Sequence, residues 1–296
     1  MKEILIISGK GGTGKTTVSA SLADIAAPQH KLVLADVDVD AANLEILLAP
    51  HVEHTYPFMA GKVAVIDQDA CIACGICEDV CRFDAVQQNE DGKFVIDSAF
   101  CEGCLSCVHQ CPANAIETKV HQSGEWYRSA SNYGVLFHAN LYPGEENSGK
   151  LVTQVKEDAR KFGEETQADF LLIDGPPGIG CPVTAALNGV DAAVIVSEPT
   201  LTGFHDMRRA KETADFFRIP TLLVINKSDL NPAIRDEMLV FSAQKGMALA
   251  GLIPYDEEIV HALSARKPLT QTLPERYHPL FSRIWQDITT TVCSAI

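Results

Sequence analysis

Two groups of residues in this chain of 296 residues have the types and the spacing that chemistry requires. One is a glycine-rich loop that ends in Lys15 and Thr16. A curled glycine backbone binds phosphate, and clustered thiolates bind iron. The sequence therefore predicts a nucleotide site and redox centres in one polypeptide. The thiolates come from two cysteine runs with the same spacing, C-x2-C-x2-C-x3-C, which are Cys71, Cys74, Cys77 and Cys81, and Cys101, Cys104, Cys107 and Cys111.

The glycine-rich loop has the complete pattern G-x4-G-K-T, with a short apolar run before it and an expected helix after it. Its glycines let successive N–H groups point at a phosphate, and the N-terminus of the helix adds its dipole. We expect Lys15 to contact the β and γ phosphates and the Thr16 hydroxyl to ligate Mg²⁺. The residues expected to hold the nucleotide are Gly9, Lys10, Gly11, Gly12, Thr13, Gly14, Lys15, Thr16 and Thr17.

Asp174 is the second group expected at the magnesium ion. It ends the apolar run Leu171–Ile173 and precedes Gly175–Gly178, a stretch of glycine and proline. An aspartate at the end of a strand is the group with which P-loop proteins hold Mg²⁺, here expected to act through water. The stretch after it suits a loop that senses the γ-phosphate, and a plain turn at the end of a strand is the alternative.

Both cysteine runs match the bacterial two-cluster ferredoxin pattern, in which the fourth cysteine of each run ligates the other cluster. Pro112 follows the last cysteine as that pattern expects, whereas Arg82 stands where the first run would have its proline. Zinc is the rival ion, but zinc sites pair two C-x2-C knuckles across a longer gap. We therefore expect two 4Fe–4S clusters. The predicted ligand sets are Cys71, Cys74, Cys77 and Cys111 for one cluster and Cys101, Cys104, Cys107 and Cys81 for the other.

The charge and composition oppose several classes of partner. A net charge of -15 opposes binding to nucleic acid, because a phosphate backbone needs a basic footprint. It also opposes docking on an anionic membrane surface, and no apolar stretch approaches the roughly 18 residues of a membrane-spanning helix. Met1–Ser8 leads straight into the loop and is interpreted as a first strand, not a signal peptide. A cytoplasmic location is expected, where clustered cysteines are metal ligands more often than disulfides.

Buried apolar segments alternate with helical ones on both sides of the cysteine region, which predicts a parallel sheet covered on both faces. The predicted fold class is α/β: a P-loop NTPase with a doubly wound, mostly parallel sheet, interrupted by a small ferredoxin-like α+β insertion. Strands are expected at 4–7, 31–36, 170–174, 192–197, 221–226 and 249–253, with a returning hairpin at 126–129 and 135–138. Helices are expected at 15–26, 150–162, 183–188, 203–217 and 232–245.

The cysteine region interrupts this alternation after the second strand. Its two halves resemble each other, which indicates an internal duplication, and it contains no long helical pattern. The predicted domains are a P-loop ATPase domain at residues 1–55 and 122–296 and an inserted domain at residues 56–121.

Lys10 gives the loop a resemblance to a known family. The sequence Lys10–Thr17 resembles the deviant phosphate-binding loop of the MinD/ParA family, which includes the nitrogenase iron protein and Mrp-type cluster carriers. The resemblance implies that Lys10 reaches across an ATP-dependent homodimer to the partner's phosphates. It extends to the run Asp36–Asp38, and it implies that Asp38 positions the attacking water. Lys10, Lys15 and Asp38 are the catalytic residues expected on this basis.

The segment Asn226–Asp229 follows an expected strand and resembles a base-recognition segment. The family resemblance implies that Asn226 contacts adenine and that Pro254, Tyr255 and Asp256 lie near the base. The pattern Asn-Lys-x-Asp also resembles the guanine-reading motif of GTPases, but the type of phosphate loop favours ATP. ATP, Mg²⁺ and two 4Fe–4S clusters are therefore the expected cofactors.

Two cysteines and three histidines stand outside these sets. Cys181 and Cys293 are expected to be small buried apolar residues. Cys181 lies just past the expected switch loop, as a cluster-ligating cysteine does in the nitrogenase iron protein, so transient binding of a transferred cluster is its alternative role. His109, His121 and His138 are expected to be hydrogen-bonded structural groups, with a relay role as the alternative for His138.

The C-terminal segment Pro279–Ile288 has Phe281, Ile284 and Trp285 at helical spacing. MinD proteins use a basic amphipathic tail on membranes, but this segment has one arginine and one aspartate. We therefore expect a helix that packs in the core.

Three functions are compatible with these features. The leading hypothesis is an ATPase that dimerises around ATP and passes electrons through two clusters to a partner protein when ATP fixes the conformation. The first alternative is a carrier of an iron–sulfur cluster or metallocofactor for an assembly partner, although fully ligated clusters oppose the lability that a carrier needs. The second is a spatial organiser of the MinD/ParA type with redox-sensing clusters, which the acidic charge does not support.

Overall fold

The computed structural model describes residues 1–98, 100–145, 147–259 and 264–294. The chain divides into two compact units, and each is discontinuous in sequence. The larger unit comprises Met1–Tyr56, Glu125–Leu141 and Ser148–Ile296, and the smaller unit comprises Pro57–Gly124 and Tyr142–Asn147.

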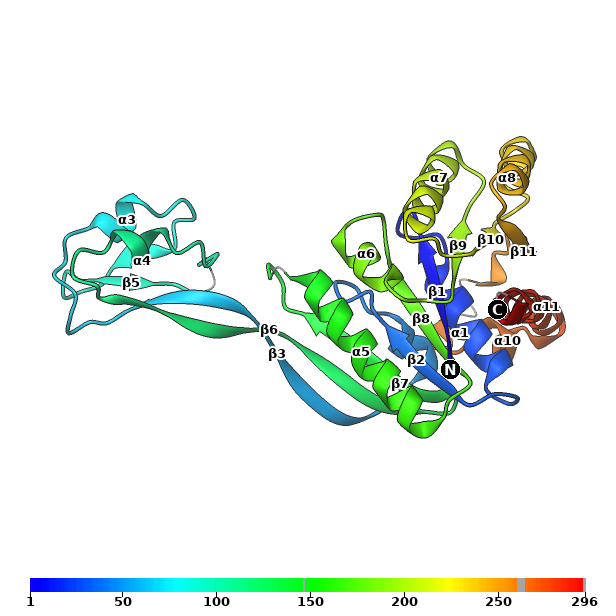
Figure 1. Ribbon diagram of the computed structural model, residues 1–296, viewed down its shortest axis with the longest axis horizontal. Helices are drawn as coiled ribbons and strands as arrows, with labels where there is room; N and C mark the ends of the chain where they lie inside the picture. Colours follow the sequence, from blue (N-terminus) through cyan, green and yellow to red (C-terminus); the bar gives the residue numbers. More distant parts are fainter. Residues whose placement is uncertain (99, 146, 260–263, 295–296) are drawn as a thin grey trace. The chain divides into compact units, whose positions relative to one another are not determined.

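Among the described residues, the main sheet has nine strands in the order β11-β10-β9-β1-β8-β2-β7-β6-β3. The strands from β11 to β7 in this order all pair in parallel. The sheet is therefore mostly parallel, with the β6–β7 hairpin and β3 at one edge (Figure 1). The strands are β1 Lys2–Ser8, β2 Leu32–Asp36, β3 His51–Ile66, β6 Ile116–Ser131, β7 Gly134–Leu141, β8 Phe170–Pro177, β9 Ala192–Ser197, β10 Thr221–Asn226 and β11 Ala248–Ile253.

Helices cover both faces of the sheet in the larger unit (Figure 1). Helices α1 and α11 pack together and share one hydrophobic cluster with Ile4 and Ile6 of β1. By strand alternation Leu5 and Ile7 point to the opposite face, where α5 packs against α6. The helices are α1 Lys15–Ala26, α2 Leu44–Leu48, α5 Ser148–Thr166, α6 Cys181–Leu187, α7 Leu201–Phe216, α8 Pro232–Gln244, α10 Leu269–Thr272 and α11 Pro274–Ser294.

The smaller unit repeats one pattern twice: a cysteine run that contains a short helix, followed by a strand. The first run contains α3 (Ile76–Asp79) and precedes β4 (Val86–Gln88), and the second contains α4 (Ser106–Gln110) and precedes β6. Strand β4 pairs antiparallel with β5 (Phe94–Ile96). The apolar residues around this pair form a small core of their own, whose buried members are Ala64, Ile66, Cys77, Val86, Phe94 and Ile116.

The strongly apolar strands and the helices that follow them lie where the sequence predicts them. Helix α11 buries Tyr277, Phe281, Ile284, Trp285 and Ile288, so the prediction of core packing at the C-terminus is confirmed. No helix among the described residues is long and apolar enough to cross a membrane.

Two features of the edge are absent from the sequence-based prediction. Strands β3 and β6 are each 16 residues long, although only 126–129 was expected as strand. Helix α2 was not expected either. The cause is exposure: most residues in the first half of β3 are open to solvent, so they lack the apolar alternation that marks a half-buried strand.

Lys156 on α5 is a buried lysine that should give the larger unit a distinctive pH dependence. Its ammonium donates to the carbonyl of Ala186 at 2.7 Å and to that of Asn188 at 2.5 Å. Burial lowers its pKa to about 8. An unfolded lysine titrates near ~10.4, so between these two values the folded state binds fewer protons and folding becomes more favourable as the pH rises.

We therefore expect the unfolding free energy of the wild type, relative to Lys156→Met, to increase by about 2 kcal/mol between pH 8 and 10. Denaturant unfolding of both proteins at several pH values measures this difference. Titrations elsewhere in the chain cancel in the comparison. A difference that stays constant with pH would show that Lys156 remains fully charged in the folded protein.

Candidate nucleotide cleft and cysteine sites

The glycine-rich loop joins β1 to α1 and wraps one end of an open cleft of ≈ 1480 Å³. Gly14 has φ +90°, a left-handed conformation that favours glycine, and a Cβ there would lie 2.4 Å from the Asn226 amide nitrogen. A Cβ on Gly11 or Gly12 would meet nothing within 4 Å, so the cleft side of the loop is open. The buried Thr13 hydroxyl has no hydrogen-bond partner among the described residues. The loop therefore presents open backbone to the cleft and holds an unsatisfied hydroxyl beneath its surface.

Asp174 gathers three side chains at the start of α1. Its carboxylate accepts a hydrogen bond from the Lys15 ammonium at 2.9 Å and one from the Thr16 hydroxyl at 2.7 Å. The Ser19 hydroxyl donates to it at 2.8 Å. The two residues expected to bind magnesium, Thr16 and Asp174, are thus in direct contact. Ser19 was not expected here, although its position four residues after Lys15 places it on the same helix face.

Three carboxylates share one lysine at this point. Burial alone would lower the pKa of Lys15, but Asp174, Asp36 and Asp38 outweigh it and raise that pKa. Burial raises the pKa of Asp36 to about 7, and Asp174 adds to the effect. Burial also raises the pKa of Asp38, which lies 3.7 Å from the Lys15 ammonium. The site has more negative than positive charge, so a divalent cation there is favourable.

Asp36 fixes the segment that follows Asp38. Its carboxylate accepts from the backbone N–H groups of Asp38 at 3.1 Å, Asn43 at 3.1 Å and Leu44 at 2.9 Å. Because Asn43 and Leu44 begin α2, the position of this helix depends on Asp36. No motif in the sequence marks this role of Asp36, which depends on its hydrogen bonds to the backbone that follows. Asp36 is also in register with Asp174 across β2 and β8.

Lys10 is paired within its own chain. Its ammonium lies 2.6 Å from a carboxylate oxygen of Glu198, and Lys227 lies 3.1 Å from the other oxygen. Glu198 follows β9 directly, and no motif in the sequence marks it as part of the site. The two lysines hold the pKa of Glu198 below its usual value, against the opposing effect of burial.

The four residues expected around the base are not among those that line the cleft, and of them Asn226 contacts the loop. Asn226 donates from its amide to the Thr13 carbonyl at 2.8 Å, so it braces the loop. The backbone N–H of Tyr255 donates to Asp229 at 2.6 Å, which brings the two expected base segments together. Asp256 is bound to Arg276 and to the Tyr277 hydroxyl, and Tyr255 is exposed.

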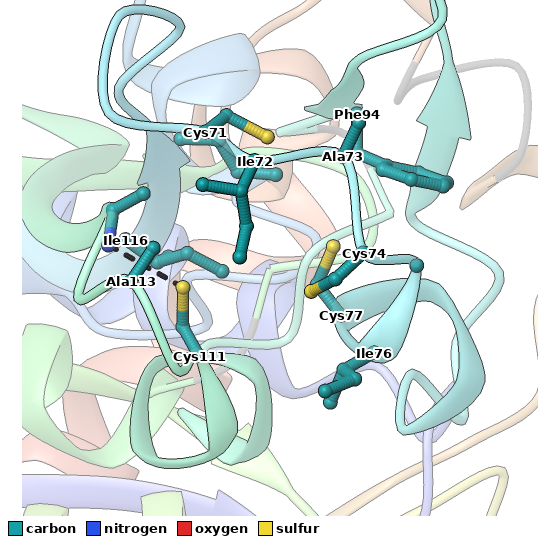
Figure 2. A pocket seen from close by; sticks show the side chains of 13 residues that line it. Cys71, Ile72, Ala73, Cys74, Ile76, Cys77, Phe94, Cys111, Ala113 and Ile116 are labelled. Carbon is teal, nitrogen blue, oxygen red and sulfur yellow. Dashed lines mark hydrogen bonds between the residues drawn. The ribbon is translucent and has the colours of Figure 1, made fainter.

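Two hollows in the smaller unit are each lined by four cysteines. Figure 2 shows the first, where the sulfurs surround an apolar space that includes Ile72 and Ile116. Its volume is ≈ 330 Å³ and that of the second is ≈ 350 Å³. Each hollow takes three cysteines from one run and the fourth from the other run. The first is lined by Cys71, Cys74, Cys77 and Cys111, and the second by Cys81, Cys101, Cys104 and Cys107.

Backbone groups already point at two of these sulfurs. The N–H of Ala115 donates to Cys111 Sγ at 3.3 Å, and the N–H of Ala64 donates to Cys101 Sγ at 3.5 Å. Within the described residues, no three histidine, cysteine, aspartate or glutamate side chains converge closely enough to hold a single metal ion. The sulfurs of each set are spread around a hollow instead.

The two remaining cysteines correct the sequence-based prediction. Cys181 and Cys293 are both exposed, not buried. Cys181 is the first residue of α6, and a helix end at the protein surface leaves its first side chain in solvent. Cys293 lies in the last turn of α11, on the side away from the buried residue Val292.

Together, the phosphate-binding loop, the strand-end aspartate and the parallel sheet define a P-loop nucleotide-binding protein of the α/β class. The chain belongs to the CobQ/CobB/MinD/ParA family: the model described as "CbiA: CobQ/CobB/MinD/ParA nucleotide binding domain" matches residues 4–269.

The chain is also similar to individual proteins and solved structures. The chain is 37% identical over 229 residues to the uncharacterized protein MJ0578 of Methanocaldococcus jannaschii. This match covers 77% of this chain and 79% of the relative. A match of 58 residues is 43% identical to pyruvate synthase subunit PorD of the same organism and covers 20% of this chain and 66% of that subunit. The septum site-determining protein MinD of Pyrococcus horikoshii, solved with Mg-ADP, has the same fold: TM-score 0.57, 17% identity, covering 97% of this chain and 95% of that one.

Proposed function

We propose that this protein is an ATP-hydrolysing iron–sulfur protein that couples its nucleotide state to electron transfer through two 4Fe–4S clusters. The observation that carries the proposal is the crossed lining of the two hollows, three cysteines from one run and one from the other. Crossed ligation of this kind belongs to two-cluster ferredoxins. The match to a pyruvate synthase subunit adds support.

The cleft residues suit Mg-ATP. Lys15 is the first residue of α1 and is held there by Asp174, a position from which it would neutralise phosphate charge. The Thr16 hydroxyl and Asp174 lie together and supply oxygen ligands for Mg²⁺. Asp38 lines the cleft and has a carboxylate whose pKa is raised by burial, which suits a group that orients and accepts a proton from water. The Mg-ADP bound by the MinD relative supports the same ligand class.

Lys10 supports an ATP-dependent homodimer. In the single chain Glu198 neutralises the charge of Lys10. The phosphates of ATP bound to a second copy would be a stronger acidic partner for this lysine. Binding of ATP between two copies would exchange one ion pair for the other. The protein partner beyond the dimer is proposed to be a redox protein.

The two hollows fit clusters better than single ions. Their sulfurs surround a space of several hundred cubic ångströms, and their walls are mostly apolar, which limits the access of water to a redox centre. The N–H groups of Ala64 and Ala115 donate to ligand sulfurs, an interaction that stabilises the reduced state. The clusters would supply one-electron carriers, and the cysteines, these N–H groups and the apolar walls set their potential.

An anaerobic redox titration monitored by EPR, with and without Mg-ATP, tests the proposal. We expect two low-potential 4Fe–4S signals whose potential or line shape changes when Mg-ATP binds, because the switch segments around Asp38 and Asp174 respond to the γ-phosphate. Two stable clusters indifferent to ATP would refute the coupling. Absence of clusters after anaerobic reconstitution would refute the redox function altogether.

A cluster-carrier function is the second candidate, because Cys181 is exposed close to the segment that follows Asp174. An exposed thiol can bind a cluster in transit, whereas a buried one cannot. In the same titration a carrier would show no nucleotide-dependent change of potential. With an apo-acceptor protein and Mg-ATP added, it would transfer iron to that acceptor during hydrolysis.

A further inference from the structure

A row of polar residues crosses four neighbouring strands of the larger unit. Asp36 of β2 is in register with Asp174 of β8 on one side and with His138 of β7 on the other. The next strand contributes Ser129, whose hydroxyl lies 2.9 Å from His138 Nε2. Residues in register on parallel strands present their side chains to the same face. The row therefore leads from the proposed magnesium position to strand β6.

Glu45 connects this row to the helix that follows Asp38. Its carboxylate lies 3.0 Å from His138 Nδ1, and it stands in the first turn of α2, whose start is fixed by Asp36. A neutral imidazole with its proton on Nδ1 donates to Glu45 and accepts from the Ser129 hydroxyl, so both ring nitrogens are satisfied. The Tyr127 ring stacks on the imidazole, with centroids 5.0 Å apart.

The grouping Ser129, His138 and Glu45 has the chemistry of a hydrolytic triad, but its placement excludes that function. Ser129 is fully buried and His138 is 2% exposed, so no acyl substrate reaches the hydroxyl. The buried Ser129–His138 pair, with a partner on each ring nitrogen, instead fixes the relative positions of the elements that it joins.

Strand β6 gives this network its significance. Ser129 lies near its C-terminal end, and Ile116 at its first residue lines the first cysteine hollow. Residues 116–124 of the strand belong to the smaller unit and residues 125–131 to the larger one. Ser129 and Ile116 are therefore parts of one strand, and a displacement of Ser129 should be visible in the amide exchange of that strand.

We infer that His138 is a positioning residue that couples the start of α2 to strand β6, so that movement of the Asp38–Leu44 segment changes the hydrogen-exchange protection of the strand whose first residue lines the first cysteine hollow. The inference deepens the proposed function, on which its redox consequence rests. It assigns the coupling to two hydrogen bonds, one on each ring nitrogen of His138.

Hydrogen exchange of the full-length chain tests the coupling directly, with Mg-AMPPNP, a non-hydrolysable ATP analogue that keeps the γ-phosphate, as the probe. Glu45 is the residue to change, because its side chain is 44% exposed and the fold should tolerate replacement. In the wild type, Mg-AMPPNP should change the exchange of peptides from 116–131. Glu45→Ala should lose more than half of that change. Glu45→Gln should retain it, because the amide oxygen still accepts from His138.

The controls separate coupling from general damage. Glu165→Ala, an exposed glutamate on α5, should behave as the wild type. Mg-AMPPNP affinity should be equal in all four proteins, since Glu45 does not line the cleft. The coupling is overturned if wild-type β6 does not respond to Mg-AMPPNP, or if Glu45→Ala responds as fully as the wild type.

The midpoint potentials distinguish this inference from the proposed function. If nucleotide shifts the wild-type potential and Glu45→Ala shows the same shift, the coupling through His138 is wrong and the proposed function stands. If nucleotide changes β6 exchange through Glu45 but leaves the wild-type potential unchanged, the coupling stands and the proposed redox function is wrong.

Discussion

Replacing Lys15 with methionine is expected to lower the rate of ATP hydrolysis at least ~100-fold. The Lys15 ammonium sits between Asp174 at 2.9 Å and Asp38 at 3.7 Å, at the position where β and γ phosphates would meet the loop. Methionine has a similar length but no charge, so charge that develops on the phosphate would lack its cation. A phosphate-release assay under saturating Mg-ATP measures the loss.

The same variant should show a separate effect on stability. Without Lys15, the carboxylates of Asp36, Asp38 and Asp174 have no cation between them. Loss of one partner of a buried charge cluster costs on the order of 3 kcal/mol. Mg²⁺ alone should therefore raise the melting temperature of the variant more than that of the wild type. Lys211→Met is the matched control, because Lys211 is also buried and paired, with Asp215 on α7, away from the cleft.

A Lys15→Met protein that hydrolyses ATP at the wild-type rate would remove the cleft from the proposed function. A variant that loses hydrolysis but gains nothing from Mg²⁺ would place the cation elsewhere. The two measurements thus test the phosphate role and the carboxylate site independently.

The parts of the fold that were predicted from sequence are those encoded by local spacing. Helix α1 spans Lys15–Ala26 as expected, because the loop pattern fixes its start. Strands such as β9 (Ala192–Ser197) are buried on both faces and therefore form uninterrupted apolar runs. The crossed cysteine sets were also expected, since a run of three residues after the third cysteine turns the fourth away from its neighbours.

The parts that were missed depend on contacts between distant segments. The row Asp174, Asp36, His138 and Ser129 exists only because β8, β2, β7 and β6 are neighbours in space, and no spacing in the sequence encodes that order. The loop Tyr142–Asn147 lies in the smaller unit, although it comes between two elements of the larger one. Its side-chain contact, His121 with Glu145 at 2.9 Å, joins residues that show no motif.

The exposed cysteines illustrate a different limit. Residue type alone predicts that an isolated cysteine lies in the core. Cys181 and Cys293 are nevertheless both exposed. Their positions at helix ends decide their exposure, and helix ends are the least certain part of a sequence-based prediction. Composition therefore predicts metal-binding thiols, but only the fold separates the eight that line hollows from the two that do not.

Pairs of cysteine replacements should reveal the crossed ligand sets by iron content alone. Cys74 and Cys111 line the same hollow, so Cys74→Ala with Cys111→Ala should lose one cluster and keep about four iron atoms per chain. Cys74 and Cys81 line different hollows, so the corresponding double variant should lose both clusters. Alanine is used because a serine oxygen can replace a thiolate as a ligand. Iron analysis after anaerobic reconstitution measures both variants.

Each double variant removes two thiolates, so general loss of thiol content predicts equal iron in both. Ligation within a run predicts the reverse of our expectation, because Cys74 and Cys81 would then hold one cluster and Cys111 the other. The control is Cys181→Ala with Cys293→Ala, which removes two exposed thiols outside the hollows and should keep about eight iron atoms. Under crossed ligation Cys74 and Cys111 hold the same cluster, although they are far apart in sequence, so replacing both costs a single cluster. Only crossed ligation therefore makes this double variant less damaging than the one at Cys74 and Cys81.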